Sequence, residues 1–261
     1  MKRIAPLLAM LVLLAGCRAK PVVAIDPRIL DCVPVVAIVL DGNRHSTGLL
    51  LDDGTVLMSS HALPDDEDRG KAEISGFEVE YRVSSRGSFR GSIDRKLQPA
   101  PGPLEDWAVI TPDPPIARDR VVGCTVPLVV SFEPPRFGET VYYVGYTAEP
   151  EAGSNDRLLV RYWVPFVVTN PPWNFRSSFG DSVFWLQAPS RRFFRDHLST
   201  YNMLGRPLDE ARPGFSGGPL LRLGHDSLGN ARLEVCGVMQ GRRRGAGDLG
   251  LAVVPRGVPQ R

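Results

Sequence analysis

Ser216 lies in a run of residues suited to a catalytic nucleophile. Residues 212–220 read Arg-Pro-Gly-Phe-Ser-Gly-Gly-Pro-Leu. A serine that attacks a carbonyl must stand on a tight turn whose backbone N–H groups face the developing oxyanion. Glycines permit the dihedral angles and the close approach that such a turn requires. The apolar neighbours Phe215 and Leu220 argue against a flexible linker, so Ser216 is predicted to be the nucleophile.

A histidine follows a predicted β-hairpin. Residues 46–58 read as a strand, a turn at Asp53-Gly54 and a second apolar strand. His61 stands where this second strand ends. A lone histidine is most often structural, but the hairpin before it favours a general base. Three other histidines lack such a frame and are predicted to be surface or structural residues: His45, His197 and His225.

An acidic residue opens the next strong strand pattern. Asp106 precedes the apolar residues 107–110. A carboxylate beside Nδ1 of a histidine fixes the tautomer and stabilises the imidazolium that forms when a serine is deprotonated. Glu105 is the rival acid but lies one residue out of register. Asp106 is therefore predicted to orient His61.

Together these segments resemble the trypsin-like (chymotrypsin-fold) serine peptidases over residues 35–255. The order His, Asp, Ser is that of this fold, whereas subtilisins and α/β-hydrolases use other orders. Residues 138–146 and 235–255 resemble strands of the family's second barrel. The runs Pro-Gly-x-Ser-Gly-Gly-Pro-Leu and Leu-Ala-Val-Val-Pro are closer to the bacterial Deg/HtrA-like branch than to digestive enzymes. We expect no PDZ domain, since the chain stops soon after the peptidase pattern.

The resemblance implies an all-β fold of two six-stranded antiparallel β-barrels packed face to face. Independently, 26 Gly and 24 Pro spread between short apolar runs favour many strands over long helices. We expect the N-terminal barrel over residues 31–125 and the C-terminal barrel over residues 126–261. Together they would form one peptidase domain with the site in the cleft between them.

The function that the resemblance implies is a serine endopeptidase. Ser216 would form an acyl-enzyme, His61 would carry the proton, and the N–H groups of Gly214 and Ser216 would bind the oxyanion. No cofactor is needed, and no His, Cys or carboxylate cluster has the spacing of a metal site. Zymogen-type relatives carry an aspartate before the serine where this chain has Phe215. We therefore expect an enzyme that is competent once folded.

The register of the resemblance also assigns a substrate pocket. Glu210 would lie at its base and favour Lys or Arg in the substrate, while Met239 and Gly241 would line it. The arginines at 242–244 would stand on the opposite wall and favour acidic residues. Both sets can also be read as solvated loop charges, so the preferred side chain stays open.

Cysteines divide into three roles. The resemblance implies a disulfide between Cys32 and Cys124, because some chymotrypsin relatives tie the N-terminal segment to the linker between the barrels. Free buried thiols are the alternative. Cys236 stands in an apolar strand and is predicted to be inert core.

The N-terminus is typical of an exported protein. Residues 1–3 carry a positive charge, and residues 4–14 are apolar but too short to span a bilayer. The run Leu-Ala-Gly-Cys at 14–17 resembles the lipobox of bacterial lipoproteins. The alternatives are an ordinary signal peptide or a short membrane anchor.

The lipobox implies a signal peptide over residues 1–16 and acylation, with palmitate for example, of Cys17. Residues 17–30 would then form the lipid attachment and tether. The next residue, Arg18, is not the aspartate that often retains lipoproteins in the inner membrane. We therefore expect a bacterial cell-envelope location on the outer membrane, facing the periplasm or the exterior.

The charge balance limits the partners. With 31 basic and 29 acidic residues the formal net charge is +2, and no nucleic-acid motif is present, so nucleic acid is not an expected partner. The expected partners are polypeptide substrates and, through Cys17, a membrane.

A second class of function stays open. The chain could be a catalytically silent trypsin-like domain that serves as a surface binding or scaffold lipoprotein. Silent homologues usually lose a triad residue, whereas His61, Asp106 and Ser216 are all present here. An esterase with the same triad is a further alternative that fits the double-barrel resemblance less well.

Overall fold

Two largely antiparallel sheets make up almost all of the described regular structure. The computed structural model describes residues 25–40, 44–63, 73–74, 77–83, 87–97, 106–124, 126–131, 133–150, 157–171, 183–188, 215–242 and 249–256. Within these ranges the helical segments are a five-residue helix and two short 3-10 turns: α2 (Pro27–Asp31), η1 (Ser60–Ala62) and η2 (Arg118–Arg120). The all-β prediction is therefore supported. No helix in the described part of the chain is long and apolar enough to cross a membrane.

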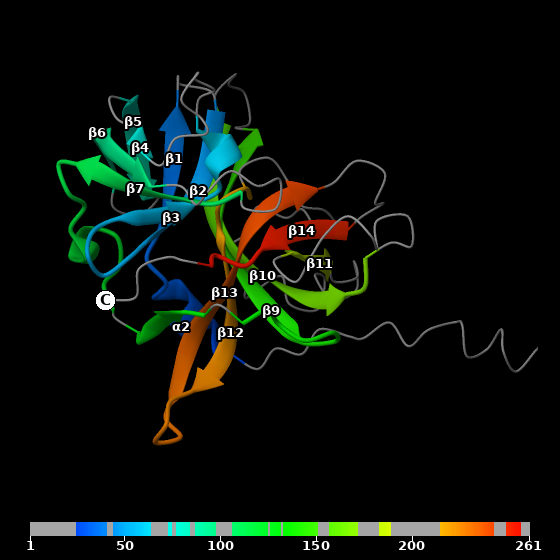
Figure 1. Cartoon of the computed structure of the whole chain (residues 1–261). Helices are drawn as coiled ribbons and strands as arrows, with labels where there is room; N and C mark the ends of the chain where they lie inside the picture. Colours follow the sequence, from blue (N-terminus) through cyan, green and yellow to red (C-terminus); the bar gives the residue numbers. More distant parts are fainter. Residues whose placement is uncertain are drawn as a thin grey trace, which may run out of the picture.

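The first sheet is built from the N-terminal half of the chain (Figure 1). Its strands are β1 (Val35–Leu40), β2 (Arg44–Leu50), β3 (Val56–Met58), β4 (Glu73–Ile74), β5 (Phe77–Val83), β6 (Gly87–Leu97) and β7 (Ala108–Asp113). They are arranged in the order β4-β6-β5-β1-β2-β3-β7, and an additional pairing joins β6 to β7. With that pairing, strands β6, β5, β1, β2, β3 and β7 form a closed series, and β4 lies outside it.

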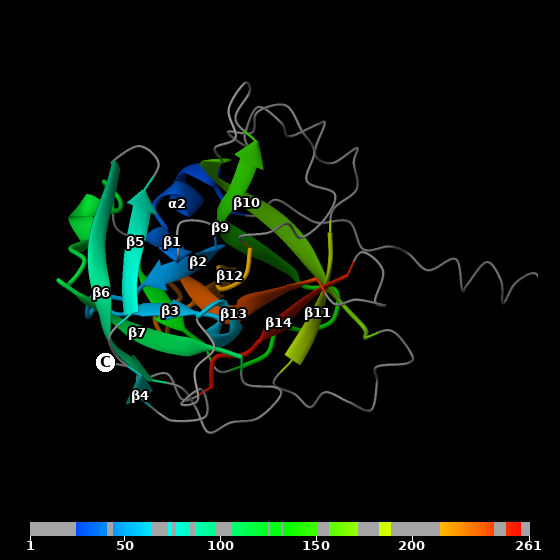
Figure 2. The same ribbon diagram turned by 90° about the horizontal axis from the view of Figure 1, so that it is seen from above.

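The second sheet follows in the C-terminal half. Its strands are β8 (Leu128–Val130), β9 (Thr140–Pro150), β10 (Arg157–Thr169), β11 (Val183–Gln187), β12 (Pro219–His225), β13 (Ala231–Arg242) and β14 (Leu249–Val253). The order is β12-β9-β10-β11-β14-β13-β8, with β12 also paired to β13. Figure 2 shows the two sheets side by side, the first on the left and the second on the right.

In each sheet six of the seven described strands are linked in a closed series of pairings, and one strand lies outside that series. The two strands outside these series, β4 and β8, are short and lie at sheet ends. β4 has two residues beside β6, and β8 has three residues paired parallel to β13. Pieces this short carry too few alternating positions to stand out in a sequence.

Strand β1 explains why the two sheets pack together. Its residues from Val35 to Val39 are all buried. Because side chains alternate across a strand, Val36 and Ile38 fill one core while Val35 and Ala37 join another. The second of these cores also contains residues of β9, β12 and β13. The first sheet therefore has an apolar face on both sides, and one of them packs against the second sheet.

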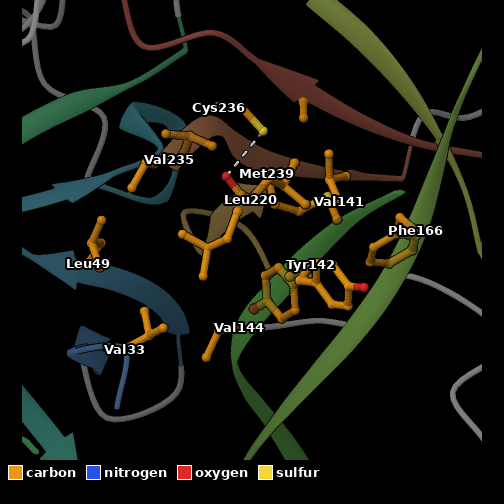
Figure 3. Packing of buried hydrophobic residues seen from close by; sticks show 14 of the residues in the cluster. Val33, Leu49, Val141, Tyr142, Val144, Phe166, Leu220, Val235, Cys236 and Met239 are labelled. Atoms are coloured by element: carbon orange, nitrogen blue, oxygen red, sulfur yellow. Dashed lines mark hydrogen bonds between the residues drawn. The ribbon is translucent and has the colours of Figure 1, made fainter. Parts of the chain in front are cut away.

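The larger core is where side chains from both sheets meet. Figure 3 shows Leu49 of β2 facing the same interior as Val144 of β9 and Leu220 of β12. Cys236 lies in this core, fully buried, with its thiol donating to the carbonyl of Leu220. Burial raises the pKa of this thiol to about 12, so it is the unreactive core residue that the sequence predicted.

The N-terminal segment is tied down at α2. Asp26 caps the helix by accepting the N–H of Arg28 at 2.9 Å, and Pro27 stands at its start. The Arg161 side chain donates to the carbonyls of Leu30, Asp31 and Val33 beyond it. A disulfide joins Cys32 to Cys124, which follows the first sheet. The segment around α2 is thus covalently linked to the segment that joins the two sheets.

The Cys32–Cys124 disulfide closes a sequence separation of 92 residues. A double variant Cys32→Ser/Cys124→Ser should lose about 4–5 kcal/mol of unfolding free energy, because the cross-link restricts the unfolded chain. Guanidinium unfolding followed by tryptophan fluorescence measures this. Wild type unfolded under reducing conditions should match the double variant. An unfolding midpoint unchanged by both treatments would contradict the prediction.

Candidate active site

The turn that carries Ser216 is fixed by its two glycines. It precedes β12, and Gly217 has φ +87°. A Cβ at Gly217 would lie 2.2 Å from the carbonyl oxygen of Thr47, and one at Gly218 would lie 2.3 Å from the ring of Tyr143. Any side chain at either position would clash with Thr47 or Tyr143 and displace the turn. The glycines predicted for close backbone approach are needed for that reason.

Backbone bonds hold this turn against β13. The N–H of Gly217 donates to the carbonyl of Met239 at 2.7 Å, and the N–H of Met239 donates to the carbonyl of Gly218 at 2.9 Å. β13 has a bulge immediately after Met239, where the register of its pairing with β14 shifts between Met239 and Gly241. The bulge leaves Gln240 outside the regular ladder, next to the serine.

The carbonyl and the hydroxyl of Ser216 have different partners. The carbonyl accepts the N–H of Thr47 at 2.9 Å and the hydroxyl of Ser46 at 2.6 Å. The hydroxyl donates to the carbonyl of Gln240 at 3.0 Å. The serine proton is therefore directed at a backbone oxygen in this structure, and its transfer to an imidazole requires rotation of the side chain.

His61 and Asp106 are brought together by two neighbouring strands. His61 lies in η1 just after β3, and Asp106 lies just before β7. β3 and β7 run antiparallel with Met58 opposite Ala108, so the residues beyond these positions share one edge of the first sheet. There the Nδ1 atom of His61 is hydrogen-bonded to Oδ2 of Asp106.

Asp106 accepts two further bonds at its other oxygen. The backbone N–H of His61 and the hydroxyl of Ser60 both donate to Oδ1 at 2.8 Å. Burial alone would raise the pKa of this carboxyl, but the bonds and charge of His61 and the bond from Ser60 outweigh it, so the pKa is lowered. Asp106 is thus held ionised, while the His61 side chain is 42% exposed and open to a substrate.

The serine turn packs against the segment that leads to His61. A Cβ at Gly217 would lie 3.0 Å from the backbone nitrogen of Ser59, which is two residues before His61. The turn of the second sheet is therefore seated on the same edge of the first sheet that holds His61 and Asp106. This arrangement can support proton transfer from a serine to a histidine oriented by a carboxylate.

Other predicted site residues are only partly covered by the structure. Met239 is fully buried in β13. Gly241 adopts φ +114° and lies beside Ser216, because a Cβ at this glycine would be 3.5 Å from Oγ of Ser216. Several predicted residues lie outside the described residues: Cys17, Glu105, His197, Gly214, Glu210, Arg243 and Arg244. In the described ranges, no group of three or more His, Cys, Asp or Glu side chains could hold a metal ion.

Sequence reasoning did not single out the residues that support Ser216. Ser46 and Thr47 stand at the start of the predicted hairpin, and no sequence pattern links Gln240 or Tyr143 to the site. Their contacts to the serine turn come from segments that are distant in the chain or belong to a different strand. No local pattern predicts such contacts.

Comparisons with known proteins support the fold. No family model and no curated protein matches the chain. Among solved structures, the inactivated protease paralogue S-D1 of the scabies mite superimposes with a TM-score of 0.57 at 13% identity, covering 91% of each chain. A Glu endopeptidase gives a TM-score of 0.49 at 14% identity over 91% of each chain. The Rv3671c protease of M. tuberculosis in its active form gives 0.48 at 16% identity, covering 90% of this chain and 83% of that one.

The likeness to the scabies mite paralogue shows a protease-like fold. This agrees with the fold class that the sequence predicted, at the level of the overall chain path. At such low identity the likeness extends to the fold and not to activity.

Asp106→Asn tests whether this carboxylate is held ionised by the fold. Because its pKa is lower when folded than when unfolded, its charge stabilises the protein above about pH 4, and this contribution is lost as the pH falls through the folded pKa. The difference in unfolding free energy between wild type and Asp106→Asn should therefore be largest above about pH 5 and shrink in acid. Denaturant unfolding at a series of pH values measures it. A difference that does not change with pH would contradict the assignment.

Proposed function

We propose that this protein is a serine endopeptidase that cleaves peptide bonds through an acyl-enzyme. The observation that carries the proposal is the seating of the Ser216 turn on the edge that presents the bonded pair His61 and Asp106. A serine on a turn held by glycines, an exposed imidazole and a partly buried carboxylate are the parts that acyl transfer needs.

In the proposed mechanism the Ser216 side chain first rotates away from the carbonyl of Gln240 towards His61. Its Oγ attacks the substrate carbonyl while the imidazole takes the proton, and Asp106 stabilises the imidazolium that results. The backbone N–H groups of Gly214 and Ser216 would bind the oxyanion. His61 then protonates the leaving amine, and a water molecule repeats the sequence to release the acyl group.

The bulge in β13 favours polypeptides over simple esters as substrates. Beyond Val238 the described part of β13 is no longer paired with β12, and the carbonyl of Gln240 accepts the Ser216 hydroxyl. An extended peptide can add to such a strand edge by backbone hydrogen bonds, and its N–H could replace the hydroxyl at this carbonyl. Glu210, Met239 and Gly241 would contribute to the pocket for its side chain.

A catalytically silent binding or scaffold domain is the second candidate. The bond from the Ser216 hydroxyl to Gln240 favours it, since that hydroxyl is not directed at His61. The two candidates differ in one property, which is whether Ser216 reacts with an electrophile.

We propose further that the chain is anchored by an acylated Cys17 in a bacterial cell envelope, on the outer membrane, and that it is closer to the Deg/HtrA-like branch than to digestive enzymes. The support is the sequence itself, in the lipobox-like run at 14–17 and in the residues around Ser216. Two acyl chains would hold a protein stably at a membrane, whereas one is marginal.

Labelling with a fluorophosphonate probe separates an enzyme from a scaffold. A soluble form beginning at Lys20 should label, and Ser216→Ala should not. His61→Ala should label at least about a thousand times more slowly, because triad members act as a unit. Ser227→Ala, on the exposed turn between β12 and β13, is the matched control and should label like wild type. Silence from folded wild-type protein would rule out the constitutive enzyme and leave the binding domain.

Cys17→Ser tests the anchor in a bacterial host. The full-length wild type should fractionate with membranes and incorporate labelled palmitate, because acyl chains partition into the bilayer. The variant should lose the label and become soluble in the periplasm or retain its signal peptide. Lys20→Ser is a control that should behave as wild type. Equal palmitate incorporation by wild type and Cys17→Ser would show that Cys17 is not acylated.

A further inference from the structure

The carbonyl of Ser216 accepts two hydrogen bonds from a strand of the first sheet. β2 supplies both donors, the hydroxyl of Ser46 at 2.6 Å and the N–H of Thr47 at 2.9 Å. β2 belongs to the first sheet, which also holds His61 and Asp106, whereas the serine turn belongs to the second. The catalytic serine is thus attached directly to the half of the molecule that carries its proposed base.

The turn packs closely against β2 at Gly217. A Cβ at Gly217 would lie 2.2 Å from the carbonyl of Thr47 and 3.0 Å from Oγ of Ser46. Ser46 is 2% exposed, so its hydroxyl is desolvated and its bond to the carbonyl is not shared with bulk water. A buried bond of this kind restricts the direction of the peptide plane that it holds.

Aromatic packing supports the turn from its other side. The ring of Phe215 stacks on Tyr143 with centroids 4.5 Å apart and lies 5.3 Å from Tyr162. The Tyr143 hydroxyl is hydrogen-bonded to Oγ1 of Thr47 at 3.2 Å, and burial raises the pKa of this phenol, so it remains protonated. The same Oγ1 accepts the N–H of Tyr146 at 2.9 Å. β2 and the residue before the nucleophile are therefore parts of one packed unit.

We infer that Ser46 is a positioning residue for the nucleophile. Its hydroxyl fixes the peptide plane between Ser216 and Gly217, and so sets the direction in which the Ser216 side chain leaves the backbone relative to His61. The inference rests on the proposed function for its catalytic consequence. A displacement of about 1 Å at a reacting group can lower a rate about a hundredfold.

The structure separates this role from simple support of the fold. Without the Ser46 hydroxyl, the Ser216 carbonyl would keep the N–H of Thr47 as a partner, and β2 would keep its pairing with β1, in which Ile38 lies opposite Ser46. The loss would fall on the orientation of the turn and not on the existence of the strand.

The test compares Ser46→Ala with Ser46→Thr, which restores a hydroxyl. Ser46→Ala should lower kcat on a peptide substrate, and the rate of fluorophosphonate labelling, by about 10–100-fold with KM nearly unchanged. Ser46→Thr should recover most of this loss. The matched control is Ser131→Ala, which removes a hydroxyl that bonds Arg222 beside β8 and should leave kcat unaltered. A wild-type kcat in Ser46→Ala would overturn the inference, as would a loss that follows the melting temperature and is not recovered by Ser46→Thr.

Amide hydrogen exchange gives a readout that does not need activity. Exchange at Gly217 and Thr47 should be faster in Ser46→Ala than in wild type and Ser46→Thr, because one restraint on the turn is gone. Unchanged exchange would overturn the inference. If wild-type protein fails to label while its exchange responds as described, the proposed function has failed and the positioning of the turn stands.

Discussion

The site depends on hydrogen bonds that cross from one sheet to the other at the backbone of Ser216. His61 and Asp106 are placed by β3 and β7, and the serine is placed by a turn before β12. Two such groups meet productively only if the sheets keep a fixed relative position. A large apolar core between the sheets supplies most of the attraction, but apolar contact has no preferred direction. The bonds from Ser46 and Thr47 to the Ser216 carbonyl supply the direction.

The core explains why such directional bonds can be kept. β1 is buried on both faces, so the first sheet has its own interior and also contributes to the shared core. β2, beside it, carries Ser46 and Thr47 between these two packed regions, where both residues are almost fully buried. Bonded arrangements of hydroxyl groups are favoured in such surroundings, since an unpaired one costs about 1–3 kcal/mol. Burial therefore favours the same bonds that hold the backbone of Ser216.

Sequence reasoning reached the local parts of this arrangement and missed the long-range ones. The hairpin before His61, the strand after Asp106 and the glycines after Ser216 depend on neighbouring residues, and the strand-rich fold follows from the same local patterns. Short β4, β8 and α2 lacked a strong pattern. The roles of Ser46 and Tyr143 arise from contacts across 170 and 96 residues of chain respectively, which one sequence cannot reveal.

The hydrogen bond between the Ser216 hydroxyl and the Gln240 carbonyl bears on the choice between enzyme and scaffold. The free energy of this bond determines how strongly it could oppose catalysis. A neutral hydrogen bond contributes about 0.5–1.5 kcal/mol. If breaking it were required before attack and nothing replaced it, the rate would fall by roughly tenfold at most. Enzymes accelerate their reactions by at least about a millionfold, so this cost is small beside the effect of a nucleophile and base. A peptide N–H that took over the carbonyl would remove even that cost. The orientation of this hydroxyl in the unliganded protein is therefore compatible with catalysis, and the geometry of Asp106, His61 and the glycine-locked turn carries more weight.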